Sequence, residues 1–170
     1  MKNKNGFTLV ETMVYIAILS MAMVGFITFV MSISAARNKN YTVLEVQANT
    51  RQAMEIISQK IRDAADVKIA SSTFGSDPGK LTLITTNTST NPTVIDLTTQ
   101  DGSLRITEGT SSPIIITANK VLVSNLVFYN YTGTSRRDSI GIAATFSYYN
   151  PGNDIDYNFS QSVRSNISLH

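Results

Sequence analysis

The feature that most constrains this chain is a long stretch without charge near its N-terminus. Thr12–Ala36 contains no Asp, Glu, Lys or Arg, and the only charged residue between Phe7 and Ala36 is Glu11. As a helix rising about 1.5 Å per residue, Thr12–Ala36 would be about 37 Å long, and the hydrocarbon core of a bilayer is about 30 Å thick. The stretch therefore predicts a helix that crosses a membrane.

Glu11 does not prevent insertion of this helix. The run from Phe7 to Ala36 contains thirteen Leu, Ile, Phe and Val residues. Each contributes about −0.3 to −0.6 kcal/mol at the helix centre, against about +3 kcal/mol for one carboxylate, which costs less near a helix end. An acid within a span indicates function and needs a cationic partner, which the charge-free run does not contain. Glu11 is therefore a candidate functional residue.

Three other interpretations of this segment are open at this point. The first is a signal peptide, with the basic Lys2 and Lys4, an apolar run and a cleavage site at Ser34-Ala35-Ala36. Cleavage there would release an exported binding domain. The apolar run, however, is longer than the usual 7–15 residues of such peptides. A permanent single-span anchor carrying an exposed binding head would leave Gly6 and Glu11 unexplained. A buried helix of a soluble protein would need a far larger domain to cover it.

Composition argues against most catalytic chemistry. Cysteine is absent, so the 170-residue chain has no disulfide framework and no thiolate metal site, and its one histidine is His170. Phosphate-binding loops and G-x-S-x-G elbows are also missing from the sequence. We therefore expect no enzyme activity and no cofactor.

Two polar segments after residue 130 were weighed as sites. Asp154 and Asp156 follow Pro151-Gly152 and could offer oxygen ligands to calcium, but calcium needs 6–8 oxygens, so a polar hairpin turn is the favoured interpretation and we predict no metal. Arg136-Arg137 could touch a partner or a DNA backbone. With a net charge of only +2 and scattered basic residues, a solvated turn is favoured, and nucleic acid is an unlikely but not an excluded partner.

The remainder of the chain predicts one amphipathic helix half and a β-rich head. Apolar or small residues recur at helical spacing from residue 37 to about 70, at Val43, Val46, Thr50, Ala53/Met54, Ile57, Ile61 and Ala64. A turn-rich connector, 71–79, precedes strand-like segments at Lys80–Thr86, Thr93–Thr98, Ser103–Thr107, Ile114–Thr117, Val121–Tyr131, Ser139–Tyr149 and Ile155–Ser168. Their close spacing favours hairpins. The expected fold is α+β, a long N-terminal helix packed against an antiparallel β-sheet in residues 71–170.

The start of the chain resembles a known family. Lys2, Lys4 and the run Gly6-Phe7-Thr8-Leu9-Val10-Glu11 closely resemble the leader and N-terminal methylation motif of type IV prepilins, a family of pilins and pseudopilins. The resemblance implies a leader at 1–6, cleavage after Gly6 and methylation of Phe7 by a prepilin peptidase. It also implies a membrane and filament-core helix half at 7–36 and a lollipop shape.

The resemblance further implies partners and a location. Glu11 would pair with the N-terminal amine of a neighbouring subunit during assembly, at a membrane assembly platform and among other pilins or pseudopilins. The chain would lie in the cytoplasmic membrane, head outward, before entering a pilus or pseudopilus. The basic Lys2 and Lys4 agree with a cytoplasmic N-terminus, although Arg37 and Lys39 flank the other end. More loosely, the strand pattern from Lys120 to Tyr129 and beyond is similar to J-type minor pseudopilins and related minor pilins.

Overall fold

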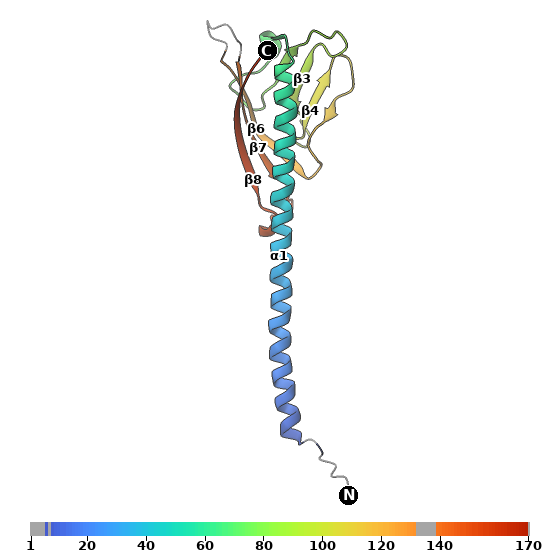
Figure 1. Cartoon of the computed structure of the whole chain (residues 1–170), viewed down its shortest axis with the longest axis vertical. Coiled ribbons are helices and arrows are strands. Elements are labelled where there is room, and N and C mark those ends of the chain that lie inside the picture. Colours follow the sequence, from blue (N-terminus) through green and yellow to red (C-terminus); the bar gives the residue numbers. More distant parts are fainter. Residues whose placement is uncertain (1–5, 7, 132–138, 170) are drawn as a thin grey trace.

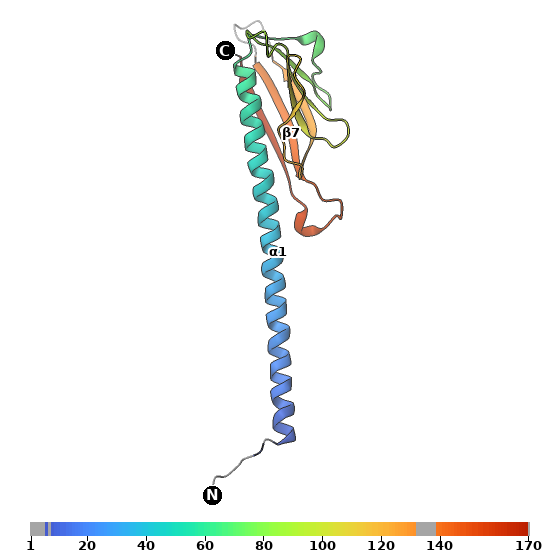
Figure 2. The same ribbon diagram turned by 90° about the vertical axis from the view of Figure 1, so that its right-hand side faces the viewer.

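A single rod-like helix carries a β-rich head at its C-terminal end (Figure 1). The structure, a computed structural model, describes Gly6, residues 8–131 and residues 139–169. Helix α1 (Leu9–Arg62) has 54 residues, which corresponds to about 81 Å. Its N-terminal half projects away from the head and its C-terminal half forms one wall of it (Figures 1 and 2). The predicted α+β lollipop is confirmed.

The helix ends earlier than the sequence pattern predicted. We expected it to continue to about Ile69, but it ends at Arg62. Beyond it, the N–H of Ala65 donates to the carbonyl of Ile84 at 2.8 Å, and β1 (Asp66–Val67) pairs with a strand of the head. Ala64 is buried although it lies outside the helix. The apolar pattern thus continued past Arg62 because the chain stays in the core while it changes secondary structure.

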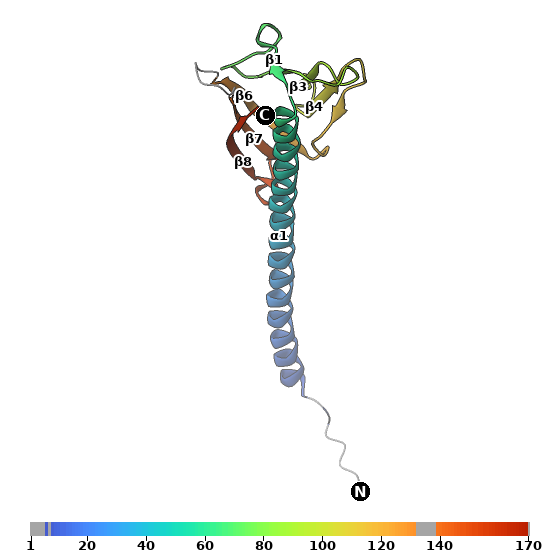
Figure 3. The same cartoon turned by 45° about the horizontal axis from the view of Figure 1, so that its top comes forward.

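The head contains two antiparallel sheets rather than the single sheet expected. The first has the order β1-β2-β3-β4-β5, with β2 at Leu81–Ile84, β3 at Thr93–Leu97, β4 at Leu104–Glu108 and β5 at Ile114–Ile115. The second has the order β6-β7-β8, with β6 at Val121–Asn130, β7 at Ser139–Tyr148 and β8 at Ser160–Ser168. Figures 1 and 3 show β6–β8 on one side of α1 and β3 and β4 on the other.

The last strand begins later than predicted. We expected a strand from Ile155, but Ile155–Tyr157 forms a 3-10 turn, η2, and β8 starts at Ser160. The carboxylate of Asp154 accepts the backbone N–H of Asp156 at 3.2 Å, a local bond that favours a turn over a strand.

The core lies between the second half of α1 and the two sheets. On the helix, Val46, Ala53, Ile57 and Ile61 are at most 1% exposed. They face buried strand residues that include Leu81, Leu83, Ile95, Leu104, Phe128, Ile140, Ile142 and Phe146. The predicted stripe is therefore largely confirmed, except that Thr42 rather than Val43 is fully buried at its beginning.

One buried polar residue of the stripe escaped the sequence analysis. The Oδ1 of Asn49 accepts the backbone N–H of Ala118 at 2.8 Å, and its Nδ2 donates to the carbonyl of Glu45 at 2.9 Å. Asn49 thereby ties α1 to the segment between β5 and β6. The Nζ of Lys60 lies 2.5 Å from the Oε1 of Glu108 and gives α1 a second polar link, to β4.

We predict that Asn49→Ala lowers the free energy of unfolding of the head by about 1 kcal/mol, because it deletes one net hydrogen bond between helix and head. Gln47→Ala, on an exposed position of the same helix, is the matched control and should change little. Thermal unfolding of the full chain in detergent, followed by near-ultraviolet circular dichroism of the tyrosines, measures both. Equal stability of the two variants would show that the Asn49 link is not used.

Candidate assembly site on the N-terminal helix

The N-terminal half of α1 is uncovered along its whole length. Every side chain from Leu9 to Ser34 is exposed, including Met21 at 81% and Phe26 at 68%. Soluble monomers rarely expose apolar patches larger than a few hundred Å². By length and composition, α1 qualifies as a helix that can cross a membrane. This half of α1, which we call the apolar rod (Leu9–Ala36), needs lipid or other protein around it.

Glu11 lies in the first turn of the apolar rod. The hydroxyl of Thr8, the N-cap residue, accepts the backbone N–H of Glu11 at 3.3 Å. Thr8-Leu9-Val10-Glu11 is thus the T-x-x-E pattern of a capping box, in which a glutamate at this position serves the helix end. An acid in the first turn also suits the positive end of the helix dipole. Glu11 therefore occupies the third helical position of a capped helix start, which the sequence analysis did not identify.

Among the residues that the structure describes, the carboxylate of Glu11 has no cationic partner. It accepts a long bond of 3.5 Å from the hydroxyl of Tyr15, one turn along the helix. Among the described residues, no Lys or Arg forms an ion pair with it. Because a carboxylate in lipid requires a positive partner, the structure leaves the place of that partner to another molecule or to the chain's own N-terminus.

The predicted cleavage position borders the helix start. Gly6 precedes the N-cap by two residues, is exposed, and has open space where a side chain would be. Phe7, the predicted methylation site, lies outside the described residues, as do Lys2 and Lys4. Since no described residue beyond its chain neighbours packs on Gly6, a change there would not disturb the described fold.

Gly25 lies inside the apolar rod without breaking it. Helix α1 is continuous through this residue, and no atom lies within 4 Å of the position a Cβ would take. The continuous helix is compatible with two interpretations of Gly25 that the sequence offers, a soft spot in the helix and a small residue for close helix packing. The open space shows that any packing partner would come from outside the chain.

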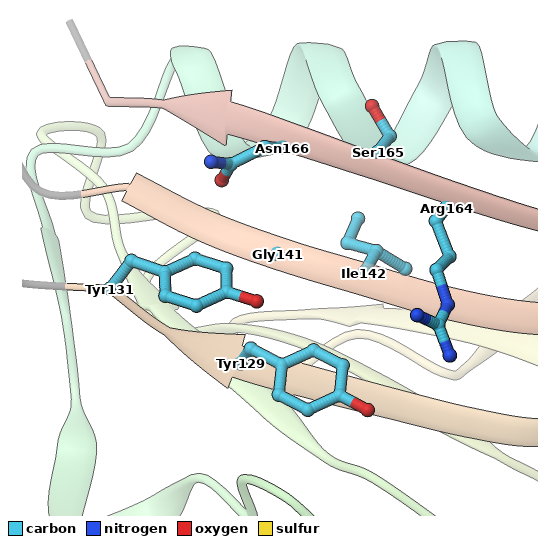
Figure 4. A pocket seen from close by; sticks show the side chains of 7 residues that line it. All are labelled: Tyr129, Tyr131, Gly141, Ile142, Arg164, Ser165 and Asn166. Atoms are coloured by element: carbon cyan, nitrogen blue, oxygen red, sulfur yellow. The ribbon is translucent and has the colours of Figure 1, made fainter.

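The head offers one shallow groove with a polar and aromatic lining. Tyr129 pairs with Gly141 on β7, and Gly141 pairs with Asn166 on β8, so the three form one row across the sheet. Figure 4 shows the rings of Tyr129 and Tyr131 lying across this row, with Arg164 beside them. A Cβ on Gly141 would lie 2.5 Å from the ring of Tyr131, so glycine is what lets the ring lie there. The groove has a volume of about 540 Å³ and is open to solvent.

The other candidates of the head contribute no further centre. The carboxylate of Asp154 caps η2, and no group of three or more His, Cys, Asp or Glu placed to hold a metal occurs in the part of the chain that the structure describes. Arg136, Arg137 and His170 lie outside the described residues. Within the described residues, no third His, Cys, Asp or Glu is placed with Asp154 and Asp156 to hold calcium.

Comparison with known proteins identifies the N-terminal segment. Residues 1–27 match the family model described as the prokaryotic N-terminal methylation motif. Together with the long apolar helix and the β-rich head, this supports a type IV pilin or pseudopilin. Members of this class are structural subunits rather than enzymes. Neither the curated proteins nor the solved structures give a match. The match ends at residue 27, so the likeness of the C-terminal half to J-type pseudopilins stays a prediction.

Proposed function

We propose that the protein is a minor pilin or pseudopilin, a structural subunit of a type IV pilus or a type II secretion-like filament. A prepilin peptidase removes residues 1–6 and methylates the new N-terminus at Phe7. The observation that carries this proposal is the methylation motif at residues 1–27, placed at the start of a helix half that no part of the described chain covers.

The apolar rod serves the monomer and the filament by the same physics. In the membrane, its exposed Leu, Ile, Val, Phe and Met side chains are dissolved in lipid. In a filament, rods of neighbouring subunits offer one another a similar apolar surface. Moving from lipid to sister rods therefore costs little hydrophobic free energy, because lipid tails are as apolar as Leu. Packing, together with the charge of Glu11, can then decide the arrangement.

Glu11 fixes which arrangement is productive. Cleavage after Gly6 creates an amine at Phe7, four residues from Glu11. In low-dielectric surroundings a carboxylate and an ammonium at about 4 Å attract by about 4 kcal/mol at an effective dielectric constant of 20. A neighbouring subunit whose amine reaches Glu11 gains this attraction, and one displaced along the rod does not. We infer that the pair sets the axial register of the subunits.

The orientation and the further partners follow from the same proposal. The N-terminus lies on the cytoplasmic side and the head lies outside the cytoplasmic membrane. The membrane assembly platform extracts the processed subunit, and other pilins or pseudopilins receive it.

We expect the processed chain in the filament fraction. Cells that express the native filament system are sheared, and the filaments are separated from the membranes and probed for the chain. It should be present in both fractions and enter the filaments only in its shortened form. A chain found solely in membranes, and uncut, would instead indicate the alternative function, a single-span membrane-anchored binding protein that presents its head at the surface.

A further inference from the structure

The end of the head nearest the apolar rod carries an unusually exposed apolar side chain. Residues 149–159, here called the basal loop, connect β7 to β8 and contain η2. Ile155, in η2, is 87% exposed, more than Met21 or Leu9 in the apolar rod itself. Figures 1 and 2 show η2 at the end of the head closest to the free half of α1. An isoleucine held in water at this place forgoes about 1.5–3 kcal/mol of burial free energy.

The level of the basal loop along α1 follows from the burial of the helix. The first side chains of α1 to lose exposure are Ala35 and Asn38, followed by the fully buried Thr42. These three positions share one helix face. η2 packs against α1, and the head covers the helix from this stretch onward.

The point on α1 at which the head begins to cover the helix coincides with the surface of a bilayer. Asn38, where the head begins to cover the helix, is two residues beyond Ala36, the last residue of the charge-free run, which is about 3 Å along the helix axis. The polar interfacial layer on each side of the hydrocarbon core is about 5–7 Å thick. If Thr12–Ala36 spans the core, the edge of the head that carries the basal loop lies at the depth of the lipid headgroups.

The basal loop and the part of α1 near it carry side chains typical of a membrane interface. Tyr41 on α1 and Tyr149 in the basal loop are about half exposed, and the Nζ of Lys120 lies 5.5 Å from the ring centre of Tyr41. Tyrosines with an apolar body and a polar tip gather at this depth in membrane proteins. The nearby charges balance in sign, comprising Arg37, Lys39 and Lys120 against Glu45, Asp154 and Asp156. Contact would therefore be driven by apolar and aromatic side chains rather than by attraction to anionic lipid.

The basal loop is built to hold Ile155 in this position. The side chain of Asn150 donates to the carbonyl of Asp154 at 2.7 Å and accepts the N–H of Asp154 at 3.1 Å. The ring of Tyr157 stacks on that of Tyr148, with 5.8 Å between ring centres. These contacts fix the loop on both sides of η2, so the exposure of Ile155 belongs to an ordered turn.

We propose that the basal loop is a membrane-contact surface that seats the head on the bilayer by inserting Ile155 into its interfacial layer. The partner is the lipid surface itself, and phosphatidylcholine suffices. This inference rests on the membrane span of the proposed function. It gives the stored monomer a defined head orientation, and the contact is released when the subunit leaves the membrane.

Tryptophan fluorescence tests the contact directly, because the chain contains no tryptophan. Ile155→Trp is introduced into the full chain and reconstituted, at high lipid-to-protein ratio, into phosphatidylcholine vesicles with or without brominated acyl chains. Ile69→Trp is the matched control, since Ile69 is 59% exposed but lies beyond the far end of α1. Phe26→Trp reports on the span.

The three positions separate this inference from the proposed function. We expect the emission of Trp at 155 to shift to the blue and to lose intensity with brominated lipid, because an inserted Trp lies at the membrane interface, near the acyl chains. Trp at 69 should be unaffected and Trp at 26 strongly quenched. Quenching of Trp at 26 with none at 155 would overturn the membrane contact alone. Ile155 would then be a contact for a neighbouring subunit instead of lipid. No quenching at 26 would overturn the span and the contact together.

Discussion

Glu11→Ala should reduce incorporation of the chain into filaments by at least about tenfold, because a lost ion pair of about 4 kcal/mol far exceeds the 1.4 kcal/mol that corresponds to a factor of ten. Membrane insertion should be unchanged or improved, since the variant removes the only charge between Phe7 and Ala36. Quantitative immunoblots of sheared filaments and of membranes from the same cells give both values.

The place of Glu11 in a T-x-x-E helix start calls for a control that separates the capping pattern from the charge. Glu11→Gln keeps the T-x-x-E/Q pattern, which glutamine satisfies as well as glutamate, but removes the charge. If the proposed pairing is right, Glu11→Gln fails in assembly nearly as severely as Glu11→Ala. Glu55→Ala, which removes an exposed acid from the part of α1 beyond the rod, should assemble normally. Normal assembly of Glu11→Gln would reduce Glu11 to a helix cap.

Gly6→Asp should abolish processing, leaving less than about a tenth of the chain in the mature form. A tenfold loss of cleavage rate corresponds to an activation free energy raised by about 1.4 kcal/mol. A charged side chain at the scissile position is expected to raise this activation free energy by more than that. The space around Gly6 is open, so the substitution costs the fold nothing and the loss must arise in the peptidase. The ratio of mature to uncut bands in cells that express the peptidase measures it.

Gly25→Ala is the matched control for this substitution. It also replaces a glycine with open space around it, and in a helix interior it adds about 1 kcal/mol of helix propensity. Processing should be complete in this variant. A mature band of normal intensity from Gly6→Asp would remove Gly6 from the cleavage site.

The sequence predicted the rod well because its signals are local. A charge-free run of sufficient length depends on residues close together in the chain, and α1 contains this run, although the helix begins at Leu9 rather than at the predicted Phe7. Strand positions were also largely predictable from alternation and from turn residues. The helix end was not, since Ala64 keeps the apolar pattern while the chain has already turned toward β1.

Long-range pairing set the limit of prediction in the head. Strand patterns do not say which strands pair, so one sheet was expected where β1–β5 and β6–β8 form two. The role of Asn49 depends on the N–H of Ala118, which is distant in the sequence. The only sequence signal for this role is that Asn49 is a polar residue within the apolar stripe. The exposure of Ile155 likewise depends on how the basal loop folds beside α1, which alternation of residues cannot show.

The most direct measurement is mass spectrometry of the N-terminus of the chain isolated from its native cells. Cleavage and modification by a prepilin peptidase predict a chain that begins with N-methylated Phe7 and lacks residues 1–6. A chain that still begins at Met1, or one cut near Ala36, would contradict the assignment as a pilin or pseudopilin.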